Sequence, residues 1–225
     1  MKPVIVMTQT SNYTNDKVTI IHLPMIKIEP LSFDKSLLES HFDWLIFSSK
    51  NAVANFYMYL KDVHVENIAV IGEKTKAYCN YLGIKVDYCP SDYSQEGLLN
   101  YFQNITNQSI LIPSSAQARP NLQDELSHRG ANVVKIDLYQ PVPFNENIYK
   151  LQQLVNDNQI DGVTFASSSA IRYFFNEANV NKEQIKCYVI GQQTFNTIKQ
   201  FDINAPIADI QTLDALVEKV LESRE

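Results

Sequence analysis

Hydroxyl side chains that follow apolar runs are the residues of this sequence best suited to chemistry. They stand in five segments: SSKNA (48–52), GEKT (72–75), PSSAQAR (113–119), ASSSA (166–170) and GQQT (191–194). Each segment follows an apolar run of strand length. In an open parallel sheet, that edge is where helix N-termini offer unpaired backbone N–H groups and a positive dipole end. The pattern predicts a site for anionic groups, although each Ser or Thr alone also fits an ordinary helix N-cap.

The sequence lacks the usual signatures of nucleophilic or nucleotide-dependent catalysis. It has no GxSxG elbow and no motif that pairs a His with a carboxylate, so a hydrolase is not indicated. GEKT resembles the lysine end of a P-loop, but the upstream GxxxxG is missing and Glu73 would oppose a phosphate. GxGxxG is missing as well, so we expect Gly72 and Gly191 to permit tight strand-to-helix turns. Any catalysis is expected to come from positioning and electrostatics.

Composition and charge argue against several partners. The net charge is −6 and the lysines and arginines are scattered singly, so nucleic acid is not an expected partner. No apolar run reaches the roughly 20 residues of a membrane span, and the N-terminus lacks a signal-like run, so a cytoplasmic protein with no membrane partner is expected. Cys79, Cys89 and Cys187 have no CxxC spacing and are predicted to be buried free thiols. The scattered histidines do not support a metal site.

The elements that must carry the hydroxyl segments form a βαβ pattern. Near-continuous apolar runs are typical of strands buried on both faces of a parallel sheet. Such runs occur at 4–7, 44–47, 68–71, 86–89, 110–113, 133–138, 162–165 and 187–190. Amphipathic segments separate them, and Gly83 and Gly130 stand where a glycine ends a helix. The predicted fold class is therefore α/β.

An internal repeat indicates two similar units. FSSKNAV (47–53) recurs as FASSSAI (165–171) at a shift of 118 residues, and VIGEKT (70–75) recurs as VIGQQT (189–194) at a shift of 119. Counting strands, the second unit is two strands short even with a short piece near 205–208. The runs VIVM (4–7) and VTIIHL (18–23) can supply the missing pair. One domain is therefore predicted to be discontinuous.

The domain boundaries follow from this count. Residues 1–23 with 144–225 are predicted to form the discontinuous α/β domain, and residues 31–137 the inserted one. The linker strands are predicted at 24–30 and 138–143, within the segments LPMIKIEP and LYQPVPF, which carry two prolines each. Proline stiffens an extended segment. A cleft lined by the Ser and Thr turns is the expected binding site.

Taken together, the FSSKNAV and FASSSAI turns, VIGEKT with its echo VIGQQT, and the LYQPVP segment resemble the uroporphyrinogen-III synthase family over essentially the whole chain. The resemblance implies two flavodoxin-like parallel-sheet domains joined by a two-stranded linker. It also implies a hydro-lyase of porphyrin and haem biosynthesis. That enzyme would close hydroxymethylbilane, a linear tetrapyrrole with eight carboxylates, into uroporphyrinogen III, with loss of water and inversion of ring D. No cofactor or metal is used in that family, and we expect a monomer.

The resemblance gives roles to particular residues. Tyr139 matches the linker tyrosine, whose hydroxyl would assist departure of the substrate hydroxyl or orient the reacting ring. Thr75 and Thr194 match the threonines after the glycine turns and would bind acetate or propionate groups. The remaining expected carboxylate-binding residues are Ser48, Ser49, Ser114, Arg119, Ser167 and Ser168. A packing tyrosine, helix N-caps and a solvated arginine are the alternative interpretations.

Two departures from the family pattern concern the N-terminal loop. The family's first strand often ends in Thr-Arg, whereas here Thr8 is followed by Gln9, and SNYTND (11–16) is short for a helix. We therefore expect a thin or mobile loop with no arginine contact. The fold pattern alone also fits a non-catalytic two-domain protein that closes on a small ligand. Tyr139 in the linker and the missing export signal weigh against that alternative.

Overall fold

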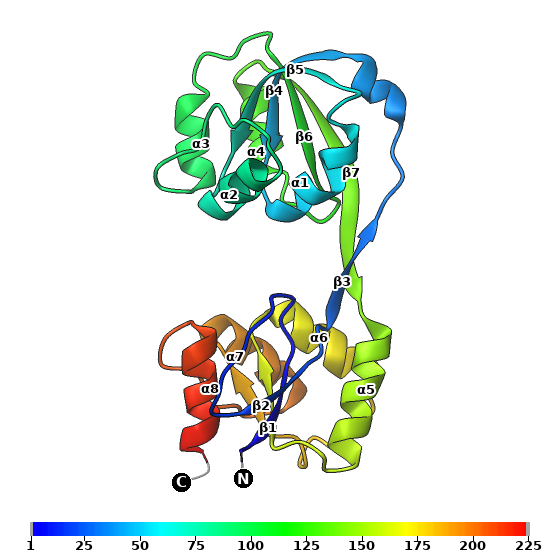
Figure 1. Ribbon diagram of the computed structural model, residues 1–225, viewed down its shortest axis with the longest axis vertical. Helices are drawn as coiled ribbons and strands as arrows, with labels where there is room; N and C mark the ends of the chain where they lie inside the picture. The colour runs from blue at the N-terminus through cyan, green and yellow to red at the C-terminus, as the bar shows by residue number, and fades with distance from the viewer. Residues whose placement is uncertain (1, 224–225) are drawn as a thin grey trace. The chain divides into compact units, whose positions relative to one another are not determined.

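The computed structural model describes residues 2–223 and divides into two compact units (Figure 1). The discontinuous unit comprises the chain up to Lys27 and from Val142 onward, and the inserted unit comprises Ile28–Pro141. Both are mixed α/β structures with parallel sheets. None of the helices in the described part of the chain is long and apolar enough to cross a membrane.

The sheet of the discontinuous unit has the strand order β2-β1-β8-β9, and each neighbouring pair is parallel. Its strands are β1 (Val4–Met7), β2 (Thr19–His22), β8 (Gly162–Phe165) and β9 (Cys187–Val189). Val189 also forms a parallel bridge with Ile207, which adds a fifth position at the edge. The helices are α5 (Asn145–Asn156), α6 (Ser168–Glu177), α7 (Gln192–Ile198), the 3₁₀ turn η3 (Lys199–Phe201) and α8 (Leu213–Glu222).

The apolar run of β1 is explained by burial on both faces of this sheet. Successive side chains of a strand point to opposite faces. Val6 packs with the core that α5, α6 and α7 cover, whereas Ile5 and Met7 pack with the core under α8. All three side chains are fully buried, and burial of each contributes about 1.5–3 kcal/mol.

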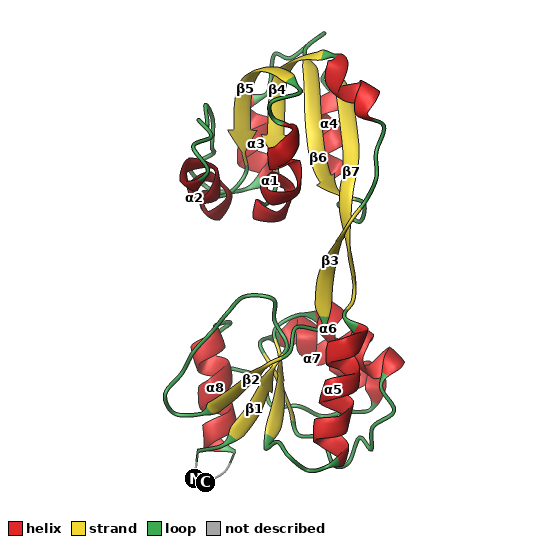
Figure 2. Cartoon of the chain, turned by 45° about the vertical axis from the view of Figure 1, so that its right-hand side comes forward, coloured by secondary structure: helices red, strands yellow, loops and turns green. Residues whose placement is uncertain are grey.

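The inserted unit has the strand order β3-β7-β6-β4-β5, with β4–β5, β4–β6 and β6–β7 parallel. Its strands are β3 (Ile26–Pro30), β4 (His41–Phe47), β5 (His64–Val70), β6 (Ser109–Ser115) and β7 (Asn132–Pro143). Its helices are η1 (Lys35–Glu39), α1 (Lys50–Phe56), η2 (Tyr57–Tyr59), α2 (Glu73–Tyr81), α3 (Gln95–Tyr101) and α4 (Asn121–His128). Helices α1 and α2 cover one face of the sheet, and α3 and α4 cover the other (Figure 2).

One predicted strand is wrong. The run at 86–89 forms only an isolated parallel bridge between Ala69 and Tyr88. Pro90 follows closely and has no backbone N–H to donate to a ladder. The chain therefore leaves the sheet edge after a single bridge.

The two sheets share one spatial order of strands. The strands of the discontinuous unit can be renumbered 1 to 4 along the chain, with the edge position at Ile207 as number 5. Their order across the sheet is then 2-1-3-4-5. Apart from β3, which adds a further position beside β7, the inserted unit gives the same order when β6 is counted first, then β7, β4, β5 and the edge at Tyr88. Strands β1 and β2 therefore take the places that β6 and β7 take in the inserted unit.

The boundary between the units falls within β3 and β7, which are neighbours in the sheet order. Leu31 N donates to Leu138 O at 2.8 Å, and Phe144 N donates to Met25 O at 2.9 Å. From the first bond to the second, the residue numbers fall on one segment and rise on the other, as they do in an antiparallel ribbon.

Candidate functional site

Each unit has a pocket where its parallel strands end and its helices begin. The Arg119 pocket lies in the inserted unit, has a volume of about 180 Å³ and is lined by Ser48, Ser114, Arg119 and Lys135 among others. The Arg172 pocket lies in the discontinuous unit, has a volume of about 410 Å³ and is lined by Ser167, Ser168, Arg172 and Thr194 among others. The sequence-predicted hydroxyl turns therefore contribute to pockets in both units.

Tyr139 and Ser49 meet in the inserted unit. Tyr139 is only 6% exposed, and its hydroxyl lies 3.0 Å from Ser49 Oγ. Ser49 is the N-cap of α1, and its Oγ accepts from Ala52 N at 3.2 Å. Since either hydroxyl can donate in the Ser49–Tyr139 bond, the pair can redistribute its protons without moving heavy atoms. The structure brings together two predicted site residues that are 90 positions apart.

A bulge in β7 places Tyr139. Ser114 pairs with Asp137 but Ser115 pairs with Tyr139, so the register shifts by one residue at Leu138. In a regular strand, Leu138 and Tyr139 would face opposite sides of the sheet. Both instead belong to the core that α1 and α2 cover. An extra residue in one strand re-aims the side chains that follow it, and here it turns the Tyr139 ring toward the start of α1.

The Thr194 side chain forms its hydrogen bonds within its own turn, at the start of α7. It is 5% exposed, and its Oγ1 accepts from Gly191 N at 3.1 Å and donates to Gly191 O at 2.7 Å. Thr75 holds the same place in the inserted unit, is also 5% exposed, and donates its backbone N–H to Gly72 O at 3.0 Å. Thr75 is not on the wall of the Arg119 pocket. The side-chain contacts of Thr194 support its helix-start interpretation, and the backbone bond of Thr75 places that threonine in the matching turn.

The expected role of the two glycines is wrong. Gly72 has φ −124° and Gly191 has φ −176°, both in extended regions that any residue adopts. Close packing explains Gly191, because a Cβ there would lie 3.0 Å from the Gln211 side chain. At Gly72 a Cβ would meet nothing within 4 Å, and nothing in the structure explains that glycine.

Ser167 and Ser168 of the Arg172 pocket form hydrogen bonds at the starts of helices α6 and α7. Ser167 caps α6 by accepting from Ala170 N at 3.2 Å. Ser168 Oγ accepts from Thr197 Oγ1 at 2.8 Å and donates to Gln193 O at 3.4 Å. Ser168 thus ties α6 to α7, and its hydroxyl proton is directed to a protein acceptor.

The remaining predicted residues line the Arg119 pocket. Ser48 is half-buried, and Ser114 is 2% exposed with Oγ 3.4 Å from Ser115 O. Arg119 is exposed in the connection between β6 and α4. The Arg119 pocket therefore combines neutral hydroxyls with a cationic side chain.

Sequence reasoning missed two cations. Lys135 lies on the wall of the Arg119 pocket and pairs with Asp137. Its signal was a lysine inside an otherwise apolar strand, VVKIDL. Arg172 lies on the wall of the Arg172 pocket, two residues after the segment ASSSA. Its signal was the i, i+4 spacing from Ser168, which puts both side chains on one face of a helix.

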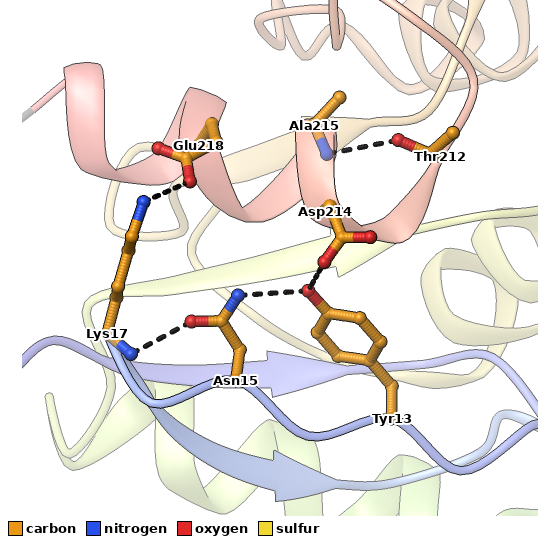
Figure 3. Close-up of polar contacts among 7 residues, drawn as sticks. All are labelled: Tyr13, Asn15, Lys17, Thr212, Asp214, Ala215 and Glu218. Atoms are coloured by element: carbon orange, nitrogen blue, oxygen red, sulfur yellow. Dashed lines mark hydrogen bonds and ion pairs between the residues drawn. The ribbon is translucent and has the colours of Figure 1, made fainter.

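The loop between β1 and β2 has no helix, as its length predicted, but it is fastened to α8 (Figure 3). The Tyr13 hydroxyl donates to Asp214 Oδ1 at 2.5 Å, and Asn15 Nδ2 donates to the Tyr13 hydroxyl at 3.0 Å. Lys17 pairs with Glu218 at 2.6 Å. Burial, followed by the hydrogen bond to Asp214, raises the pKa of Tyr13 above its ordinary value.

Gln9, the second residue after the end of β1, has a neutral polar side chain where the family pattern often has an arginine. Gln9 Nε2 donates to Ser11 O at 3.3 Å, and Gln9 O lies 2.7 Å from His22 Nε2. Gln9 Oε1 is buried and has no hydrogen-bond partner in the described part of the chain. Gln9 is thus a neutral side chain held inside the loop.

The three cysteines are free thiols. Cys79 and Cys187 are buried as predicted, whereas Cys89 is only partly buried. Burial raises the pKa of Cys79 to about 11 and raises the pKa of Cys187 further. Such thiols are poor nucleophiles near neutral pH. Within residues 2–223, no group of three His, Cys, Asp or Glu side chains is placed to hold a metal ion.

Comparison with known proteins gives one consistent family. The family model described as uroporphyrinogen-III synthase HemD matches residues 14–218. The porphyrin biosynthesis protein HemD of Ruminiclostridium josui is 22% identical over 217 residues, which cover 90% of this chain and 43% of that protein. The putative uroporphyrinogen-III synthase of Methanothermobacter thermautotrophicus is 27% identical over 192 residues, covering 78% of this chain and 76% of that protein. This chain thus spans less than half the length of the first relative.

Solved structures show the same fold. The crystal structure of uroporphyrinogen-III synthetase from Helicobacter pylori has a TM-score of 0.66 and 19% identity, and all of both chains is covered. A mutant uroporphyrinogen III synthase from Thermus thermophilus has a TM-score of 0.57 and 13% identity, covering 98% of this chain and 99% of that one. The likeness is one of mixed α/β structure with parallel sheets.

Proposed function

The chain belongs to the uroporphyrinogen-III synthase family, and from this premise we propose that it closes hydroxymethylbilane to uroporphyrinogen III with loss of water and inversion of ring D. The family model covers residues 14–218, and the resemblance seen in the sequence is thereby confirmed. Family membership does not favour the alternative of a non-catalytic ligand-binding protein. The reaction would make the chain a hydro-lyase of tetrapyrrole biosynthesis.

The proposed architecture is two flavodoxin-like domains, 1–23 with 144–225 and 31–137, joined by linker strands at 24–30 and 138–143. The strand order 2-1-3-4-5 supports this proposal, because it is the order of flavodoxin-type sheets. The division between Lys27 and Ile28 and between Pro141 and Val142 falls inside both proposed linkers. In such sheets, ligands bind beyond the carboxyl ends of the strands, where both pockets lie.

Substrate binding is proposed to use the two pockets, each within its own unit. Hydroxymethylbilane carries eight carboxylates, whereas the chain itself has a net charge of −6. Long-range attraction therefore cannot hold the substrate, and local donors must do so. Backbone N–H groups at helix starts and the guanidinium groups of Arg119 and Arg172 are suitable donors for carboxylates.

The Ser49–Tyr139 pair is the observation that carries the catalytic proposal. The substrate hydroxyl leaves when the C–O bond breaks, with electrons supplied by the pyrrole nitrogen, and the departing oxygen takes up a proton to become water. We assign Tyr139 the role of hydrogen-bond donor to that oxygen, with Ser49 orienting the phenol from behind. The cationic carbon is then attacked by the substituted carbon of ring D. The resulting spiro intermediate reopens and recloses with the ring inverted.

Conformational control is the remaining task, because free hydroxymethylbilane also closes without inversion. Holding the carboxylates fixes which carbon of ring D meets the cation, and positioning of this kind can supply a large part of a rate enhancement. The proposal therefore needs no nucleophile, in keeping with raised thiol pKa values at Cys79, Cys89 and Cys187. A cytoplasmic location is proposed with it, supported by three free cysteines. The monomeric state stays a prediction.

Isomer analysis tests the proposed function. The purified protein is incubated with hydroxymethylbilane, the product is oxidised, and the type I and type III porphyrins are separated. We expect mostly the type III isomer with protein and mostly type I without it. An isomer ratio equal to that of the protein-free control would overturn the assignment.

A further inference from the structure

The described arginines of this chain differ in whether their guanidinium group already has partners in the protein. Of its four arginines, Arg224 lies outside the described residues. Arg129 is structural: its Nη1 donates to Leu99 O and Phe102 O, and its Nη2 lies 3.9 Å from Glu125. Arg119 and Arg172 are exposed, and neither has an ion-pair partner in the described part of the chain. Each lies on the wall of a pocket at the carboxyl edge of its sheet.

Arg172 carries the charge of its pocket. It lies on α6 at i+4 from Ser168, so the two side chains share a helix face. The other wall residues are neutral, among them Ser169, Gln193 and Gln211. The first turn of α6 has no acidic residue either. The described wall of the Arg172 pocket therefore holds one cation and no carboxylate.

Two hydroxyl groups of this pocket already direct their protons to backbone carbonyls. Thr194 donates to Gly191 O and Ser168 donates to Gln193 O, whereas Ser167 Oγ accepts from Ala170 N as the N-cap of α6. A hydroxyl that donates to a backbone carbonyl has no second proton for a ligand. The donors that this leaves for an anion are Arg172, backbone N–H groups and the hydroxyls of Ser167 and Ser169, of which only Arg172 carries a charge. The main binding role thus passes from Ser168 and Thr194, which the sequence singled out, to Arg172.

We propose that Arg172 binds a carboxylate of the substrate and thereby acts in the discontinuous unit as Arg119 does in the inserted one. The inference rests on the proposed function for the identity of the substrate. The planar guanidinium presents two parallel N–H donors that match the two oxygens of a carboxylate. Since the side chain is exposed and has no ion-pair partner among residues 2–223, no ion pair of that part of the chain has to be broken for binding. Arg172 is thus a substrate-binding residue that determines affinity.

The test is direct binding of uroporphyrin III, a fluorescent macrocycle with eight carboxylates. The Arg172→Gln variant removes the charge, and Arg172→Lys keeps the charge but loses the two-donor fork. Lys182→Gln is the matched control, because it removes one exposed positive charge from the connection that leads to the amino end of β9, away from the pocket edge. Thermal unfolding of all variants checks that the fold is kept.

We expect Arg172→Gln to raise the Kd of uroporphyrin III about 10-fold and Arg172→Lys about 3-fold, with Lys182→Gln within about 2-fold of the unchanged protein. Raising the salt concentration should weaken binding to the unchanged protein more than binding to Arg172→Gln. In turnover, Arg172→Gln should raise KM while kcat changes less than about 2-fold.

Equal Kd values for Arg172→Gln and Lys182→Gln would overturn the inference, even if the unchanged protein makes the type III isomer. If the unchanged protein does not produce the type III isomer but Arg172→Gln still weakens porphyrin binding, the proposed function fails and the carboxylate site stands. The two failures are therefore distinguishable.

Discussion

Ser49 in the inserted unit and Ser167 in the discontinuous unit occupy the same place in the internal repeat. Each follows a buried strand, caps the next helix, and accepts the N–H of the third residue along at 3.2 Å. Of the two, Ser49 alone contacts a tyrosine hydroxyl within residues 2–223. In the discontinuous unit, β2 is continued by Leu23 and Met25, which are buried apolar side chains. Identical local structure thus acquires different chemistry from a strand two places away in the sheet order.

The difference suggests a division of roles between the two units. The inserted unit places a phenol against a helix cap, and we propose that this phenol assists departure of the substrate hydroxyl. The discontinuous unit has an exposed arginine, without an ion-pair partner among residues 2–223, on a pocket of about 410 Å³, and its Ser168 and Thr194 hydroxyls donate to backbone carbonyls. We therefore expect substitutions at the Ser49–Tyr139 pair to change kcat and substitutions at Arg172 to change KM.

The largest expected effect is that of Tyr139→Phe. Removing the phenolic hydroxyl should lower kcat about 100-fold, because a positioned proton donor contributes about that much or more. KM should stay within about 2-fold, since the ring still packs in the core under α1 and α2. Steady-state kinetics with hydroxymethylbilane and a thermal unfolding curve measure both quantities. An unchanged kcat would reduce Tyr139 to a packing residue.

The next effect separates the two serines. Ser49→Ala and Ser167→Ala each remove a helix N-cap, so both should lower the free energy of unfolding by about 1 kcal/mol. Ser49→Ala should also lower kcat about 10-fold, because the Tyr139 hydroxyl loses its partner. Ser167→Ala should leave kcat within about 2-fold and is therefore the matched control. Equal kcat values for the two variants would contradict the division of roles.

The sequence predicted the strands well because most are buried on both faces and appear as continuous apolar runs. It also located the helix starts, since Ser49 and Ser167 are N-caps in the structure. It could not predict the contact between Ser49 and Tyr139, which depends on strand order and on a bulge at Leu138. Neither strand order nor a bulge leaves a periodic pattern in one sequence. Arg172 was missed because the chemistry was sought in hydroxyls, whose commitment to caps only the structure reveals.

The smallest expected effect concerns alkaline stability in the inserted unit. Burial raises the pKa of Cys79 from 9.0 to about 11, so the folded state favours the neutral thiol. This contribution is fully present below pH 9 and is lost as the pH rises through about 11. The contribution of Cys79 is measured by urea unfolding of the unchanged protein and of Cys79→Ala at several pH values between 8 and 11. We expect the gap between their midpoints to narrow with rising pH, and a constant gap would contradict the pKa shift.

The measurement that tests the central claim most directly is a double-mutant cycle on kcat with Ser49→Ala and Tyr139→Phe. If Ser49 acts through the Tyr139 hydroxyl, the double variant should be no slower than Tyr139→Phe alone, because the serine has nothing left to orient. Ser167→Ala combined with Tyr139→Phe gives the reference for an independent helix cap. If the losses in kcat from Ser49→Ala and Tyr139→Phe multiply, the two residues act independently and the account of a coupled pair in the inserted unit is wrong.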